Sequence, residues 1–218
     1  MAPDTPAAPA EPTAPAAPDA PAAPAAPAAP AAPAAPAWTV APAPVESPES
    51  QALLREYHID VSDSWYMLHL GRPSTPAEIE EGLADSPSDD LAPPTGLFLV
   101  GRYGGTPAGC AGLRVLDPRT VELTRVFVRP AHRGTGGGRH LLAAVDEAAR
   151  GLGAERIVLD TRLDLTGARA LYTAYGYTEI PPYKHGPYAE VWYGRELGPG
   201  RGTGTATGGA AAGRPRGR

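Results

Sequence analysis

Residues 125–142, RVFVRPAHRGTGGGRHLL, contain four glycines within five positions, at 134 and 136–138, directly after an arginine. A residue without a Cβ allows main-chain N–H groups to come close to another molecule. The segment before the glycines alternates like a β-strand, and the segment after them carries apolar residues at helical spacing. The unpaired N–H groups at the N-terminus of a helix attract anions. The stretch therefore predicts a phosphate-binding turn between a strand and a helix.

Two common phosphate-binding motifs do not fit these residues. A P-loop requires Lys followed by Ser or Thr after the last glycine, and neither pair is present. A dinucleotide fingerprint requires a third glycine where this chain has Arg139. Asp160, at the end of the next predicted strand, resembles the acidic residue that binds the ribose in dinucleotide-binding folds. In those folds, however, the glycines follow the strand immediately. Here the residues RPAH intervene, so both motifs are excluded.

The elements that must position this turn follow from capping residues, turns and periodicity. Ser47 before Pro48 and Ser74 or Thr75 before Pro76 are typical of helix N-termini. Short turns join three strands, which favours an antiparallel meander, and the strand after the glycine-rich helix should run parallel to the third of them. The strands are predicted at 96–103, 107–116, 120–128, 155–161, 177–180 and 191–197, with further helices at about 136–153 and 165–176. The sequence predicts one mixed sheet with helices on its faces.

Both ends of the chain differ in composition from its centre. Proline recurs at every third position from 3 to 36, which forbids helix and central strand and favours a disordered or polyproline II arm over residues 1–48. Residues 198–218 contain no apolar side chain larger than alanine, so a disordered Gly/Arg-rich tail is predicted there. A globular domain is expected over 49–197.

Charge and composition narrow the range of functions. The net charge is −5, but four arginines and no acidic residue follow Glu196, which leaves −9 on the rest. Such an acidic body excludes general nucleic-acid binding and suits an amine substrate. Cys110 is the only cysteine, so no internal disulfide forms, and the five histidines show no metal-ligand spacing. No signal peptide and no apolar run of about 20 residues is present, so we expect a cytoplasmic protein without membrane contact.

The glycine turn and a second motif resemble those of one enzyme family. Arg133, Gly136 and Gly138 match R/Q-x-x-G-x-G/A, and V-x-V-x-P precedes them. ALYTAYGY at 170–177 matches A-x-x-L-Y-x-x-x-G-[FY]. With the order of elements, these motifs resemble the GNAT family of N-acetyltransferases over roughly residues 50–197. The resemblance implies an α/β (α+β) fold with a mixed sheet of about six to seven strands flanked by helices.

The resemblance also implies acetyl-CoA as co-substrate and no metal. The pantetheine arm would pair as an extra strand with Val126, Phe127 and Val128, which requires strands 120–128 and 155–161 to part. A bulge and Pro130 would help this separation. The Val128 N–H would stabilise the oxyanion. The pyrophosphate would lie on the turn formed by Arg133, Gly134, Thr135, Gly136, Gly137, Gly138 and Arg139.

Two side chains are candidates for acid–base chemistry. The resemblance places the hydroxyl of Tyr172 at the sulfur as general acid. Glu122, on the acyl-binding strand, would act as general base through a water, with Asp160 and Glu190 as rivals. Simple alternation would put Glu122 on one face with Thr124, Val126 and Val128. Many relatives have Asn where this chain has Leu165, so that contact is not transferred.

The predicted activity is transfer of acetyl from acetyl-CoA to a primary amine of a small molecule or peptide, by direct attack in a ternary complex. The acceptor would lie between the N-terminal helices and residues 180–190, within reach of Trp65, Tyr66, Tyr183, Tyr188 and Trp192. Two alternatives are transfer of a longer acyl group and a non-catalytic CoA-binding sensor or interaction domain. Formation of a homodimer is left open.

Overall fold

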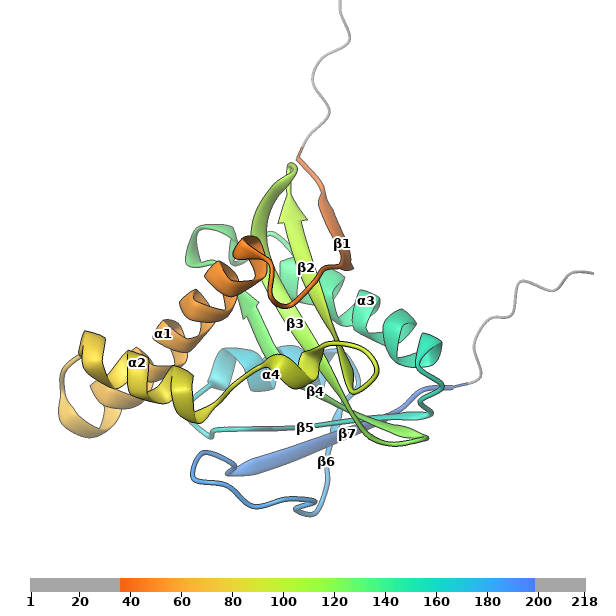
Figure 1. Ribbon diagram of the computed structural model, residues 1–218. Helices are drawn as coiled ribbons and strands as arrows, with labels where there is room; N and C mark the ends of the chain where they lie inside the picture. The colour runs from red at the N-terminus through yellow and green to blue at the C-terminus, as the bar shows by residue number, and fades with distance from the viewer. Residues whose placement is uncertain (1–35, 199–218) are drawn as a thin grey trace, which may run out of the picture. The chain divides into compact units, whose positions relative to one another are not determined.

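The computed structural model describes residues 36–198, so the predictions for residues 1–35 and 199–218 lie outside it. In the described part a seven-stranded sheet has the order β1-β2-β3-β4-β5-β7-β6 (Figure 1). The strands are β1 Trp38–Pro42, β2 Gly96–Tyr103, β3 Thr106–Asp117, β4 Thr120–Val128, β5 Arg156–Thr161, β6 Thr178–Glu179 and β7 Val191–Glu196. The helices are α1 Pro48–Leu70, α2 Pro76–Asp85, α3 Gly137–Gly151 and α4 Thr166–Ala174, with short 3-10 turns at Asp89–Leu91 and Pro130–His132. The predicted mixed sheet flanked by helices is confirmed.

The strand directions agree with the sequence prediction. β1 to β4 form antiparallel neighbours, β4 and β5 are parallel, and β7 runs antiparallel to both β5 and β6. A parallel pair needs a crossover connection, and α3 supplies it between β4 and β5. This places the N-terminus of α3 at the same edge as the C-terminal end of β4.

Two apolar cores lie on opposite faces of the sheet. The core on the α3 side contains Leu141 and Val145 of α3 with Leu123 of β4. The core on the α1 side contains Leu53 of α1 with Phe127 of β4. Figure 1 shows α1 and α3 on opposite sides of the strands. β4 is therefore covered on both faces.

The N-terminal helices begin where their capping residues predict. The Ser47 hydroxyl accepts a hydrogen bond from the Ser50 N–H at 3.2 Å, and Pro48 opens the helix. Thr75 and Glu78 form a reciprocal capping box at the start of α2. The helix that begins at Pro48 is continuous over 23 residues and ends at Gly71, which adopts the left-handed conformation.

The sheet begins within the range predicted as the proline-rich arm. β1 pairs antiparallel with β2 from Trp38, opposite Tyr103, to Pro42, opposite Leu99. Pro42 is tolerated because β1 lies at the edge of the sheet, where one side of the strand forms no hydrogen bonds to another strand. The proline count assigned this segment to the arm, but the alternating residues that follow Pro36 are sufficient for an edge strand.

A β-bulge in β4 corrects the prediction that Glu122, Thr124, Val126 and Val128 share one face. Cys110 pairs with Phe127 and Gly112 with Thr124, so β4 has one more residue than β3 in this interval. Arg125 adopts φ +54°, which is unusual for a residue other than glycine. The extra residue reverses the alternation. Glu122 therefore faces the α1 side, whereas Val126 and Val128 pack against the core on the α3 side.

Candidate active site

A gap between β4 and β5 is the central feature of the site. Their parallel pairing covers Thr120–Glu122 opposite Arg156–Val158 and stops there. β4 nevertheless continues to Val128 and β5 to Thr161, while β5 turns its other edge to β7. The bulge at Arg125 bends β4 at this point. The two strands thus part toward their C-terminal ends, as predicted.

The main chain of β4 beyond the bulge is directed into this gap at alternate residues. The Arg129 N–H donates to the Ala108 carbonyl of the neighbouring chain segment at 2.8 Å. Because successive residues of a strand direct their main-chain groups to opposite edges, those of Val128 and Val126 point to the gap. Phe127 directs its main chain toward β3 and its ring into the α1-side core. Of the three predicted residues, Val126 and Val128 are placed to pair with an extended ligand.

The glycine turn presents free main-chain donors at the end of this gap. Its other N–H groups are used internally: Arg133 donates to Pro130, Thr135 to His132 and Arg139 to Gly136. Within residues 36–198 no acceptor is recorded for the N–H groups of Gly134, Gly136, Gly137 and Gly138. These four donors surround the N-terminus of α3, which carries partial positive charge. Their arrangement suits a diphosphate.

The four glycines are required for different reasons. Gly134 and Gly136 have φ of +80° and +91°, where an L side chain is strained. A Cβ on Gly137 would overlap the Trp38 ring, and one on Gly138 would lie 2.7 Å from Leu171 Cδ2. The first pair shapes the turn, and the second allows α3 to approach β1 and α4. Glycine at 138 thus serves the packing of α3 on α4, in addition to the ligand contact expected from the sequence.

Arg133 connects the turn to both flanking elements. Its Nε donates to the Val128 carbonyl at 3.0 Å, and its guanidinium lies 2.7 Å from the Asp60 carboxylate of α1. The side chain is half exposed. In this arrangement Arg133 supports the end of β4, whereas Arg139, in the first turn of α3, is exposed.

Tyr172 lies on α4 and is buried on the α3 side of the sheet. Its ring packs against those of Tyr177 and Tyr193, with centroids 5.8 and 6.2 Å away. Burial raises the pKa of the Tyr172 hydroxyl well above its ordinary value, and the neighbouring Tyr57 and Tyr177 raise it further electrostatically. The phenol therefore stays protonated over the physiological range, and its hydroxyl has a proton to donate.

Glu122 is at the point where the strands part, and its carboxylate is fully engaged. It accepts hydrogen bonds from Tyr183 Oη and Lys184 Nζ, each at 2.7 Å, and pairs with Arg114 at 2.5 Å. Lys184 Nζ also lies 2.7 Å from Asp160 Oδ1. Burial alone would raise the pKa of Glu122, but the hydrogen bonds from Lys184 and Tyr183 outweigh it and lower the pKa. Glu122 anchors the segment after β6 to the sheet.

The rival carboxylates are also engaged. Asp160 shares Lys184 with Glu122, and Glu190 accepts the Leu163 N–H at 2.7 Å. Asp164, beside Leu165, pairs with the buried Arg162, whose guanidinium also donates to the Val61 carbonyl of α1. Sequence reasoning missed Lys184 and Arg114. The one sequence signal that could have indicated Lys184 was its position next to Tyr183, in the segment expected near the acceptor.

The aromatic residues expected around the acceptor divide into two groups. Trp65 lies beside Tyr66 at 5.1 Å and Tyr188 at 6.1 Å, which brings the C-terminal half of α1 to the segment before β7. Tyr183 instead binds Glu122, and Trp192 is opposite Asp160 in the β5–β7 register. Both groups lie on the side of the sheet that faces α1.

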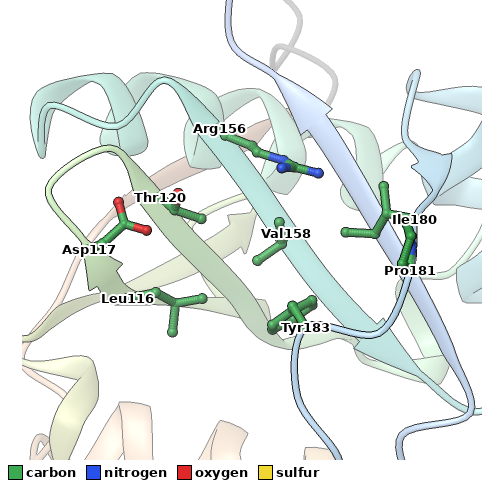
Figure 2. Close-up of a pocket in the computed structure, with 8 residues that line it drawn as sticks. All are labelled: Leu116, Asp117, Thr120, Arg156, Val158, Ile180, Pro181 and Tyr183. Atoms are coloured by element: carbon green, nitrogen blue, oxygen red, sulfur yellow. The ribbon is translucent and has the colours of Figure 1, made fainter.

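A pocket of about 390 Å³ lies beside Glu122 but away from the gap. Figure 2 shows that the pocket lies over the part of β4 and β5 in which the two strands pair with each other, with Val158 at its floor and Tyr183 at its border. Its lining residues are Leu116, Asp117, Thr120, Arg156, Val158, Ile180, Pro181 and Tyr183. It contains none of the glycine-turn residues, so it is separate from the proposed phosphate site.

Residues 36–198 lack two features that would point to other kinds of protein. In that part of the chain no helix is both long and apolar enough to cross a bilayer. The same residues include no group of three or more His, Cys, Asp or Glu side chains arranged to hold a metal ion.

Comparison with known proteins agrees with this geometry. The model of the Acetyltransferase (GNAT) family matches residues 62–177. An uncharacterized N-acetyltransferase of Schizosaccharomyces pombe is 33% identical over 132 residues, which cover 60% of this chain and 80% of that protein. The N-alpha-acetyltransferase RimI of Mycobacterium tuberculosis is 36% identical over 94 residues, 42% of this chain and 58% of that protein.

A solved structure shows the same fold. A GNAT-family acetyltransferase from Staphylococcus aureus superposes with a TM-score of 0.53 at 19% identity, covering 74% of this chain and 99% of that one. Together with the match to the family over both motifs, this establishes the class. The chain belongs to the GNAT family of acetyltransferases.

Proposed function

We propose that this protein transfers the acetyl group of acetyl-CoA to a primary amine by direct attack within a ternary complex. The observation that carries the proposal is the parting of β4 and β5 after Glu122 and Val158, with four free glycine N–H groups at the end of the gap. Membership of an acetyltransferase family supports acetyl as the group transferred.

The residues of the gap fit a ligand with a diphosphate at one end and amides along its arm. The N–H groups of Gly134 and Gly136–Gly138 would hold the diphosphate. The main-chain groups of Val126 and Val128 would pair with the amides as an added strand. Bound in this way, acetyl-CoA supplies an acetyl thioester near the point where the strands part.

Two groups of the chain would stabilise charge as the amine attacks. The N–H of Val126, which lies nearer than Val128 to the point where the strands part, donates to the developing oxyanion in place of the Val128 N–H expected from the sequence, while the Val126 carbonyl and the main-chain groups of Val128 pair with the arm. The Tyr172 hydroxyl donates to the leaving sulfur and, because its pKa is raised, keeps its proton until charge develops there. Since attack requires a neutral amine, a base must also remove a proton.

Glu122 can act as this base only when Lys184 withdraws. In the present arrangement the carboxylate accepts from Lys184 and Tyr183, and its lowered pKa makes it a weak base. The segment that carries both donors borders the α1 side, from which we propose the acceptor enters. An incoming amine would take the place of the Lys184 ammonium between Glu122 and Asp160. We therefore propose a small-molecule or peptide amine as acceptor.

Acceptor-dependent release of free thiol tests the function. The purified full chain is incubated with acetyl-CoA and a panel of amines that includes diamines, amino acids and peptides with a free N-terminus. We expect at least one amine to raise thiol release well above hydrolysis. Binding of acetyl-CoA without such a signal across all the amine classes would refute catalysis and favour a CoA-binding sensor.

A further inference from the structure

We propose that Trp38 is a positioning residue that holds the glycine turn in its phosphate-binding shape. Trp38 is the first residue of the edge strand β1, in a segment that composition assigns to the proline-rich arm. Its side chain is nonetheless buried, with 8% of the residue exposed. The proposal depends on the proposed function, because it assumes that the turn binds the diphosphate of CoA.

The indole N–H fixes the centre of the turn through Thr135. Trp38 Nε1 donates to Thr135 Oγ1 at 2.9 Å, and this hydroxyl in turn donates to the His132 carbonyl at 2.7 Å. The Thr135 N–H donates to the same carbonyl at 3.4 Å. The hydroxyl is thus held as both donor and acceptor. This closes the turn around Gly134 and leaves the N–H of Gly134 free.

The indole ring also supports the start of α3. It occupies the space that a Cβ on Gly137 would need, since that Cβ would overlap Cζ2. The ring also lies near Gly101 of β2, where an added Cβ would be 3.2 Å from Cζ3. Tyr103 and His132 flank the ring with centroids 5.5 and 6.4 Å away. The first turn of α3 therefore packs directly on Trp38.

This support matters because fixing a glycine-rich main chain in one conformation otherwise costs a large amount of conformational entropy. Glycine loses more conformational freedom on ordering than any other residue. A turn that is already held in the binding shape avoids that entropic cost when the ligand arrives. Loss of the indole should therefore weaken binding of CoA in the protein that remains folded.

The test measures the Kd of coenzyme A by titration calorimetry for Trp38→Phe in the full chain. Phenylalanine removes the N–H donor and much of the surface under Gly137. We expect the Kd to rise at least about fivefold, which corresponds to about 1 kcal/mol. Tyr103→Phe is the matched control, since it keeps the aromatic cluster and touches no hydrogen bond of the turn; its Kd should stay within twofold of wild type.

A double-mutant cycle separates positioning from general loss of packing, and its Thr135→Val variant remains informative by itself if Trp38→Phe folds poorly. Thr135→Val removes the acceptor of the indole N–H and should raise the Kd by itself. Adding Trp38→Phe should then cost clearly less than it does in the wild type. Additive effects, or a Trp38→Phe Kd within twofold of wild type, would overturn the proposal. Failure of the wild type to bind CoA would instead refute the proposed function.

Discussion

Replacing Lys184 by methionine tests the electrostatic anchor at the mouth of the gap. The substitution keeps the aliphatic stem and removes one ammonium that lies 2.7 Å from both Glu122 and Asp160. Removing one partner of a fully buried pair costs about 3–5 kcal/mol, whereas exposed pairs contribute about 0.2–1 kcal/mol. The side chain of Lys184 is 41% exposed and that of Glu122 only 2%.

The expected loss therefore lies between these limits. Glu122 keeps Arg114 and Tyr183 as partners, and solvent screens the exposed ammonium. We expect Lys184→Met to lower the free energy of unfolding by about 1–2 kcal/mol at neutral pH. For a domain of this size that corresponds to a fall in Tm of about 3–6 °C. Differential scanning calorimetry without ligand measures it.

The loss should depend on pH in a defined direction. The folded-state pKa of Glu122 is lowered, so its interactions stabilise the fold above its ordinary pKa and are lost as the pH falls through the folded value. The pKa of Lys184 is raised because its bonds to Asp160 and Glu122 outweigh burial, so its contribution is lost only at alkaline pH. The difference between variant and wild type should be constant near neutrality and shrink as the pH falls below the ordinary pKa of glutamate toward the lowered folded-state pKa of Glu122.

Arg119→Met is the matched control. Arg119 pairs with Glu155, but both side chains are largely exposed, so its Tm should stay within error of wild type. A Tm for Lys184→Met equal to that of this control would contradict the reasoning. A loss of stability in Lys184→Met that stays the same size at acidic pH would contradict it as well. If Glu122 is the base, the same variant should move the acidic limb of the kcat/KM profile to higher pH, because burial then acts on Glu122 with less compensation.

Three further outcomes are expected. In thermal-shift assays, Gly136→Glu should remove the stabilisation that acetyl-CoA gives the wild type, which is about 2.7 kcal/mol at a ligand concentration about a hundred times Kd. Gly153→Glu is the control, because Gly153 has a similar positive φ at the far end of α3, and it should keep this stabilisation. If both variants keep the stabilisation equally, the diphosphate binds elsewhere. Tyr172→Phe should lower kcat at least about tenfold with little change in acetyl-CoA affinity, and an unchanged kcat would end its role as acid. Cys110 is buried and its thiol pKa is raised, so a thiol reagent should label it only on unfolding.

Local patterns in the sequence determined much of the architecture. Caps such as Ser47 and Thr75 act within one helical turn, and the alternation in β2 to β4 acts between adjacent strands, so both can be read from neighbouring residues. The same holds for the glycine turn, because the positive φ at Gly134 and Gly136 is a local requirement. The gap between β4 and β5, by contrast, was expected only from the resemblance of the two motifs to the GNAT family, and the structure contains it.

Only the tertiary structure decided how the site is completed. The bulge at Arg125 is a choice of register between β3 and β4, and it moved Glu122 to the face opposite Val126. The contacts of Glu122 with Lys184 and of Trp38 with Thr135 join residues 62 and 97 positions apart. Composition and periodicity describe neighbours along the chain, whereas such pairings are set by the packing of whole elements against one another. That is why the motifs predicted the class of enzyme but not the contacts that hold Glu122 and the glycine turn in place.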